Sequence, residues 1–172
     1  MPDAVESNAL ESRLEQSWRS NAEAWSSAVR ERRIASRRAG TDAAIVDAVR
    51  RTHARRVLDL GCGEGWLARA LVERDCEVVG VDASPELIAA ARALGAARYE
   101  FAAYAELASR TNELGSFDAA VFNFALLGED VQTPLRAARA LLHDSGVLIV
   151  QTVHPWMACG DTPYADGWRI ET

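Results

Sequence analysis

The sequence predicts an open, doubly wound α/β fold whose sheet is mostly parallel. Short apolar runs such as Arg56–Leu60 and Glu77–Asp82 alternate along the chain with segments of helical periodicity. The runs are nearly continuous, which is typical of strands that helices cover on both faces. Strands that alternate with helices form βαβ units, in which the strands are parallel.

The composition indicates one globular domain and excludes several function classes. The chain has 172 residues, of which 49% are hydrophobic and 26% are charged, so a packed core is expected. All 19 basic residues are arginine, which excludes chemistry that needs a lysine amine, such as a Schiff base. The 25 acidic residues give a formal net charge of −6, which disfavours nucleic acid as a partner of the whole surface.

Signals for membranes, secretion and metals are not found in the sequence. The apolar runs are too short to cross a bilayer, and the first residues lack the basic start and apolar stretch of a secretion signal. We therefore expect a cytoplasmic protein without membrane contact. Cys62, Cys76 and Cys159 are widely spaced and form no Cys-x-x-Cys pair, so neither a disulfide nor a metal site is expected.

Residues 1–55 are expected to form an N-terminal helical cap or lid within the single domain. Apolar residues at steps of four or seven place one stripe on its first helix, namely Leu10, Leu14, Trp18, Trp25 and Val29. A second helix is expected to start near Thr41, whose hydroxyl would cap the free amides of the first turn.

Residues 56–152 are expected to form the α/β core. The predicted strands are 56–60, 77–82, 98–103, 117–122 and 147–152. Ser84-Pro85 predicts a helix start, because a capping hydroxyl precedes a proline at the first helical position, and Thr133-Pro134 repeats this pattern. Asp144–Gly146 predicts a turn before the last strand. Residues 153–172 show no clear period and are expected to be irregular.

Three features follow the first three strands, at the carboxyl ends where such sheets bind ligands. Gly61, Gly63 and Gly65 form a turn whose backbone can approach a ligand closely. Asp82 ends the second strand and can accept hydrogen bonds from both hydroxyls of a ribose. Ala102–Tyr104 follows the third strand, where it would flank a purine ring. Together these features indicate an adenosine ligand.

Two residues near the glycines narrow the class of adenosine ligand. A dinucleotide fold expects its third glycine at position 66, where this chain has Trp66. Asp59, just before the loop, would repel phosphates and suits a ligand that carries an amine or a sulfonium. A nicotinamide-dependent oxidoreductase is therefore disfavoured.

Four segments at the strand ends carry a family resemblance. They are Val57–Gly65, with the sequence VLDLGCGEG, and Val78–Pro85, Phe117–Leu126 and Leu142–Leu148. These segments resemble the motifs of class I S-adenosylmethionine-dependent methyltransferases of the small-molecule branch. The resemblance implies a Rossmann-like methyltransferase fold with S-adenosyl-L-methionine as cofactor. The family sheet normally ends with two further strands, which we do not find here, so about five strands with an exposed fifth edge are expected.

The resemblance also implies roles for individual residues. Asp59, just before the glycine loop, and Gly61 would hold the methionine part of the cofactor, and Cys62, Gly63 and Gly65 belong to the same cofactor-binding loop. Asp82 would bind the ribose, while Ala83, Ala103 and Tyr104 would frame the adenine. Asn123 and Phe124 would line the sulfonium and the substrate entry. Arg37 or Arg38 would bind the cofactor carboxylate.

The implied activity is methyl transfer to a small-molecule acceptor. His154 follows the fifth strand, and it is interpreted either as a general base or as part of a structural turn. Two alternatives stay open: a non-catalytic module that binds the cofactor or a partner protein, and an RNA-modifying enzyme that uses the arginines of Arg30–Arg56. The expected partners are a small-molecule substrate and, through the edge of the fifth strand, a second copy of the chain.

Overall fold

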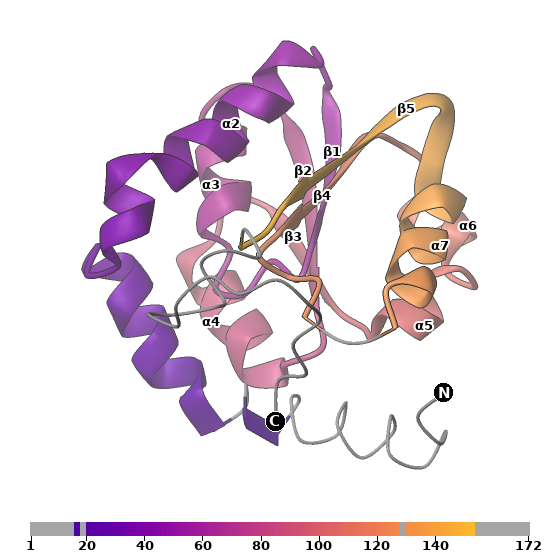
Figure 1. The fold of residues 1–172 in the computed structure, drawn as a ribbon. Coiled ribbons are helices and arrows are strands. Elements are labelled where there is room, and N and C mark those ends of the chain that lie inside the picture. The colour runs from indigo at the N-terminus through magenta and orange to yellow at the C-terminus, as the bar shows by residue number, and fades with distance from the viewer. Residues whose placement is uncertain (1–15, 18–19, 128–129, 154–172) are drawn as a thin grey trace, which may run out of the picture.

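The computed structural model describes residues 16–17, 20–127 and 130–153, which form a five-stranded sheet between two layers of helices (Figure 1). The strands are β1 (Arg56–Leu60), β2 (Glu77–Asp82), β3 (Arg98–Phe101), β4 (Phe117–Asn123) and β5 (Leu142–Gln151). They lie in the order β3-β2-β1-β4-β5, and every described pair is parallel. The predicted fold class is confirmed.

The order of the strands reverses at β1. The chain passes outward from β1 through β2 to β3, and then returns to place β4 on the other side of β1. Leu60, the last residue of β1, pairs with Val81 of β2 and with Phe122 of β4. The loops that follow these three strands therefore start at nearly the same level, at the switch point where doubly wound sheets bind ligands.

Helices cover both faces of the sheet. One face carries α2 (Asp42–Arg51), α3 (Trp66–Val72) and α4 (Pro85–Leu94), and the other carries α5 (Tyr104–Leu107), α6 (Thr111–Leu114) and α7 (Gln132–Leu141) (Figure 1). Along β1, Val57 is buried in the core of the first layer, whereas Leu58 and Leu60 are buried in the core of the second. Burial on both faces explains the nearly continuous apolar runs.

One of the three predicted helix caps is confirmed. The Ser84 hydroxyl accepts a hydrogen bond from the Leu87 amide at 3.2 Å, at the start of α4. Thr41, the last residue of the π-helical turn η1 (Arg37–Thr41), makes no side-chain cap, because it has helical φ and ψ of −66° and −34°, whereas a capping residue is normally extended. Thr133 lies inside α7. Asp130, which precedes the N-cap residue Val131, accepts hydrogen bonds from the amides of Gln132 at 2.8 Å and Thr133 at 3.1 Å.

The buried face of the N-terminal helix differs from the predicted stripe. Residues 20–30 are helical, and the buried side chains among them are Ala22, Ser26 and Val29. Val29 was expected there, but Trp25 is 37% exposed and lies beside this face, which is formed by small residues. Leu10, Leu14 and Trp18 lie outside the described residues.

Two strand boundaries also differ from the predictions. β3 ends at Phe101, two residues earlier than expected, because α5 begins at Tyr104. β5 begins at Leu142, which pairs with Phe117, and the register then shifts so that Ala119 pairs with Val147. The predicted turn at Asp144–Gly146 is therefore part of an irregularity within the strand rather than a connection before it.

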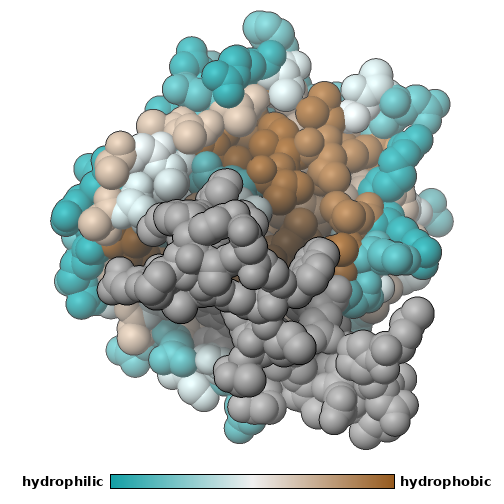
Figure 2. Space-filling model, viewed as in Figure 1, coloured by the Kyte–Doolittle hydropathy of each residue, from teal (hydrophilic) through white to brown (hydrophobic). Residues whose placement is uncertain are grey.

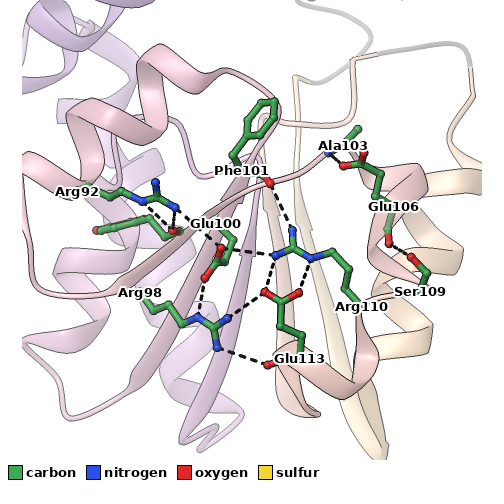
Figure 3. Close-up of polar contacts among 10 residues, drawn as sticks. Arg92, Arg98, Glu100, Phe101, Ala103, Glu106, Ser109, Arg110 and Glu113 are labelled. Atoms are coloured by element: carbon green, nitrogen blue, oxygen red, sulfur yellow. Dashed lines mark hydrogen bonds and ion pairs between the residues drawn. The ribbon is translucent and has the colours of Figure 1, made fainter.

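The described sheet has two edges of different chemistry. At β3, the Arg92 guanidinium donates to the Tyr99 carbonyl at 2.7 and 3.0 Å, and Arg110 donates to the Phe101 carbonyl at 3.3 Å (Figure 3). Glu100 lies between the guanidinium groups of three arginines, Arg92, Arg98 and Arg110. The outward carbonyls of β3 are thus bonded and the edge carries charges, which is how native sheets discourage further strand pairing.

The edge at β5 is apolar. Val147, Leu148 and Val150 are 40%, 39% and 45% exposed, and Figure 2 shows a hydrophobic surface over this strand. A hollow next to it is lined by Ala44, Ile45 and Ala48 of α2 and by residues 149–153. Within the part of the chain that the structure describes, the expected exposed edge at the fifth strand is present.

Candidate functional site

The glycine loop after β1 is held from two sides. The amides of Gly61 and Cys62 donate to the Val81 carbonyl of β2 at 2.8 and 3.0 Å. A Cβ atom on Gly61 would lie 2.5 Å from the Ala125 Cβ atom and 2.7 Å from the Tyr104 hydroxyl. A Cβ atom on Gly65 would lie 2.5 Å from the hydroxyl of Tyr99. The loop thus fits between Ala125 and Tyr104, which follow β4 and β3, on one side and Tyr99 of β3 on the other.

Gly63, between these two contacts, borders open space. Its φ is +57°, in the left-handed region, and a Cβ atom there would meet nothing within 4 Å. The Gly63 amide donates to Asp82 Oδ2 at 2.9 Å. The middle of the loop is therefore the part that a ligand could approach most closely.

Asp82 lies against the glycine loop, as the sequence predicts. Besides the bond from Gly63, its Oδ1 accepts a hydrogen bond from the Ser84 amide at 2.8 Å. Burial raises the pKa of Asp82 above its usual value, and the hydrogen bonds from the backbone oppose this rise. Each carboxylate oxygen has two lone pairs, so both can accept a further hydrogen bond from a diol.

Asp59 is a second buried carboxylate, in the strand next to that of Asp82. It lies in β1, is 1% exposed, and its Oδ2 has no hydrogen-bond partner among the described residues. Burial raises its pKa to about 7, the charge of Asp82 adds to this rise, and a backbone hydrogen bond with Ala68 opposes it. An unpaired buried carboxylate oxygen favours a cationic or hydrogen-donating partner, which fits the ammonium of an amino acid ligand.

Glu64 is a functional candidate that the sequence reasoning missed. It lies inside the glycine loop, is 1% exposed, and its Oε2 accepts from Arg69 Nη2 at 2.6 Å. Arg69 Nη1 also donates to the Glu64 carbonyl at 2.6 Å, so the pair ties the loop to α3. The available signal was a carboxylate within a glycine loop and an arginine five residues later on the following helix.

The Tyr104 side chain extends from the start of α5 to the segment that follows β4. Its hydroxyl donates to the Ala125 carbonyl at 3.2 Å, and its ring packs edge to face on Phe122 at a centroid distance of 5.6 Å. Burial raises the pKa of Tyr104. The neighbouring Ala103 amide donates to Glu106 Oε2 at 2.9 Å, so a carboxylate lies beside a residue that was expected to frame the adenine.

The ends of β4 and β5 meet through Gln151, which the sequence reasoning also missed. Its Nε2 donates to Asn123 Oδ1 at 2.8 Å and to the Thr41 carbonyl at 3.1 Å. The main-chain carbonyl of Gln151 accepts a hydrogen bond from the Phe124 amide at 2.7 Å. Phe124 has a φ of +55°, a left-handed conformation that is uncommon for a residue with a side chain.

Arg37 lies next to the glycine loop, and Arg38 makes a different contact. The Arg37 guanidinium carbon is 4.3 Å from the centroid of the Trp66 ring, at the first residue of α3, and its Nε donates to Asp42 at 2.8 Å. Arg38 donates instead to the Arg32 carbonyl at 3.1 Å and is exposed. Ala83 follows Asp82 directly, and Cys62 is buried within the loop. His154 lies outside the described residues.

The described residues include neither a candidate metal-binding cluster nor a helix that could span a membrane. Those residues contain no group of three or more His, Cys, Asp or Glu side chains that could hold a metal ion. Their helices include none that is long and apolar enough to span a membrane.

The glycine loop and Asp82 lie together at the switch point of the sheet, where doubly wound α/β proteins bind their ligands. A family model described as "Methyltransferase domain" matches residues 57–146, which are 90 of the 172 residues. The chain therefore belongs to this family of S-adenosylmethionine-dependent methyltransferases, and the resemblance to the class I enzymes is confirmed.

Known proteins support the same class. The chain is 35% identical over 107 residues to a ubiquinone biosynthesis O-methyltransferase of Xanthomonas campestris, covering 58% of this chain and 43% of that protein. It spans less than half the length of the curated relatives it matches.

Two solved structures are similar in fold. A TehB-like SAM-dependent methyltransferase from Corynebacterium glutamicum has a TM-score of 0.58 and 26% identity, over 76% of this chain and 72% of that one. An amino pentose methyltransferase of calicheamicin biosynthesis from Micromonospora echinaspora, solved with SAM bound, has a TM-score of 0.60 and 28% identity, over 76% and 56% of the two chains.

Proposed function

We propose that this chain binds S-adenosylmethionine at the carboxyl ends of β1, β2 and β4 and transfers its methyl group to a small-molecule acceptor. The observation that carries this proposal is the pairing of Asp82 with the glycine loop, beside an open space at Gly63. The unpaired oxygen of Asp59 adds an acceptor for a cationic group in the same region.

Different residues of this chain would bind the different parts of the cofactor. Asp82 would accept hydrogen bonds from both ribose hydroxyls, and Ala83, Ala103 and Tyr104 would frame the adenine. Asp59 Oδ2 would accept from the ammonium, since it is buried and has no other partner among the described residues. The Arg37 guanidinium, placed beside Trp66, would bind the carboxylate.

Bound S-adenosylmethionine supplies an electrophilic methyl group on a sulfonium sulfur. Asn123 and Phe124 would line that end of the site and align the acceptor with it, so that proximity and orientation provide most of the rate enhancement. The aromatic ring of Phe124 would also favour a positive charge. A small-molecule acceptor is supported by the names of two similar proteins, a ubiquinone biosynthesis O-methyltransferase and an amino pentose methyltransferase.

The substitution Asp82→Ala tests the cofactor site. Loss of two charge-assisted hydrogen bonds should weaken the binding of S-adenosylmethionine and S-adenosylhomocysteine about 100-fold in isothermal titration calorimetry. Asp118→Ala is the matched control, because Asp118 also accepts two backbone amides, those of Arg55 and Arg56, but at the amino end of β4. This control should lose stability and keep its affinity for both ligands.

Two outcomes would count against the proposal. Absence of binding by the folded wild-type chain would reject the cofactor, and full affinity in Asp82→Ala would reject the ribose contact. Binding without turnover on a broad panel of acceptors would favour the non-catalytic alternative.

A second pair of substitutions distinguishes Arg37 from Arg38. Arg37→Ala should weaken the binding of S-adenosylhomocysteine about tenfold, because it removes the cationic partner of the carboxylate. It should leave 5′-methylthioadenosine almost unaffected, because that ligand has no amino acid part. Arg38→Ala should change neither affinity. Equal effects of Arg37→Ala on both ligands would show that this residue acts on the fold rather than on the carboxylate.

Several finer points stay predictions. They are the division into segments 1–55, 56–152 and 153–172, the role of His154 as a base, the cytoplasmic location and the pairing of two copies through β5.

A further inference from the structure

The hydrogen bonds at Gln151 connect three segments that are distant in sequence. Gln151 and Asn123 are register partners at the carboxyl ends of β5 and β4, and their side chains are joined at 2.8 Å. The same amide nitrogen of Gln151 reaches the Thr41 carbonyl at 3.1 Å, at the junction of η1 and α2. One side chain therefore ties the N-terminal helical segment to two strand ends.

The chemistry of the three groups fixes their orientation. A backbone carbonyl only accepts hydrogen bonds, so the Gln151 atom that faces Thr41 has to be the NH₂ group. The same NH₂ group faces Asn123, so the Asn123 atom that meets it has to be the carbonyl oxygen. The NH₂ group of Asn123 is thereby turned away from Gln151, and no hydrogen bond from it is found among the described residues.

The backbone next to this amide is constrained as well. The Phe124 amide donates to the Gln151 carbonyl at 2.7 Å, and Phe124 is held at a φ of +55°. A left-handed conformation is unfavourable for a residue with a side chain, so it persists only where its surroundings hold it. Gln151 contributes to this support through its main chain, and to Asn123 through its side chain.

We propose that Gln151 is a positioning residue, which fixes Asn123 so that its Nδ2 hydrogens are presented to the cofactor site. This inference rests on the proposed function, since it assigns Asn123 to the sulfonium end of S-adenosylmethionine. Gln151 also connects the start of α2 to Asn123, because release of its side chain would leave the Thr41 carbonyl without this donor.

Side-chain amide signals in ¹⁵N NMR spectra test the orientation directly. In the free protein, the Nε2 hydrogens of Gln151, identified by their loss in Gln151→Leu, should exchange slowly with solvent. On addition of S-adenosylhomocysteine, the Nδ2 signals of Asn123 should move more than those of Gln151. The reverse pattern, or rapid exchange at Gln151 in the free protein, would overturn the proposal.

Affinity measurements distinguish positioning from a general effect on stability. Gln151→Leu should weaken the binding of S-adenosylhomocysteine about three- to tenfold, as expected for the loss of about one net hydrogen bond. Ile149→Ala is the matched control: Ile149 packs against the α2 side of the core, two residues earlier on the same strand. It should lower the melting temperature and keep the affinity.

The possible failures are separable. Unchanged affinity in Gln151→Leu, or an equal loss in Ile149→Ala, would overturn the positioning role while leaving the cofactor site intact. No binding of S-adenosylhomocysteine by the wild-type chain would reject the proposed function and this role together, whereas slow exchange at Gln151 would still report the link to Thr41.

Discussion

Replacing Gly61 with alanine is expected to destabilise the fold by about 2–5 kcal/mol and to abolish cofactor binding. The new Cβ atom would lie 2.5 Å from the Ala125 Cβ atom, which belongs to the chain that follows β4 and has little freedom to move. It would also lie 2.7 Å from the Tyr104 hydroxyl, which is bonded to the Ala125 carbonyl. Overpacking and a φ of +71° act together at this position.

Gly63→Ala is the matched control for this prediction. Its φ is also positive, but its Cβ atom would meet nothing within 4 Å, so the loss of stability should be only about 1–2 kcal/mol. Because the open space at Gly63 is where the ligand is proposed to lie, this variant should fold and still bind S-adenosylhomocysteine at least about tenfold more weakly. Urea unfolding and calorimetry measure the two effects. Equal losses of stability in the two variants would contradict the steric explanation.

Asp59→Asn is expected to raise stability at neutral and alkaline pH while weakening the binding of the cofactor. The pKa of Asp59 is raised to about 7 in the folded chain, from an ordinary value of 3.8. Between these values the folded protein holds a proton that the unfolded chain has lost, so wild-type stability falls as the pH rises through this range. The gain from Asp59→Asn should be near zero at pH 4 and reach at most about 4 kcal/mol at pH 8.

Asp118→Asn should show the opposite dependence on pH. Hydrogen bonds from the amides of Arg56 and Arg55 hold the pKa of Asp118 below its usual value, so its contribution to stability is present above that value and is lost in acid. Urea unfolding of the wild type and both variants from pH 2 to pH 8 measures the two slopes, that of Asp118 below pH 4 and that of Asp59 above it. A gain from Asp59→Asn that does not depend on pH would contradict burial of a charged carboxylate as its cause.

Binding provides the second half of the Asp59 prediction. Asp59→Asn removes the negative charge from Oδ2, which has no partner among the described residues. Affinity for S-adenosylhomocysteine should fall at least about tenfold, because its ammonium loses a charged acceptor. Affinity for 5′-methylthioadenosine, which lacks the ammonium, should stay nearly constant. Equal losses for the two ligands would place Asp59 outside the amino acid part of the site.

The fold could be predicted because its signals are local. Each strand is a short apolar run, and the Ser84 cap and its proline act within one turn of α4. The helix caps predicted at Thr41 and Thr133 were wrong, because a hydroxyl near an apolar segment does not reveal where the helix begins. Thr41 itself has helical φ and ψ, and Asp130 accepts hydrogen bonds from the amides of Gln132 and Thr133 at the start of α7.

The sequence predicts part of the arrangement at the strand ends. The proximity of the glycine loop and Asp82 could be predicted, because they follow or end strands whose carboxyl ends meet at one edge of the sheet. Glu64 and Gln151 were missed, because their roles depend on partners. Arg69 comes from the next helix, and Asn123 and Thr41 come from segments that approach only in the folded chain. The sequence does not distinguish Arg37 from Arg38, because the contact of Arg37 with Trp66 forms only in the folded chain.

The two sheet edges differ in chemistry, so a further strand would add more favourably at one edge than at the other. An incoming strand at β3 would have to displace the guanidinium groups of Arg92 and Arg110 from the carbonyls of Tyr99 and Phe101. At β5 it would instead cover valine and leucine side chains that are now 39–45% exposed, and so gain hydrophobic free energy. Any extension of this sheet, by a continuing polypeptide or by another molecule, is therefore expected to begin beside β5.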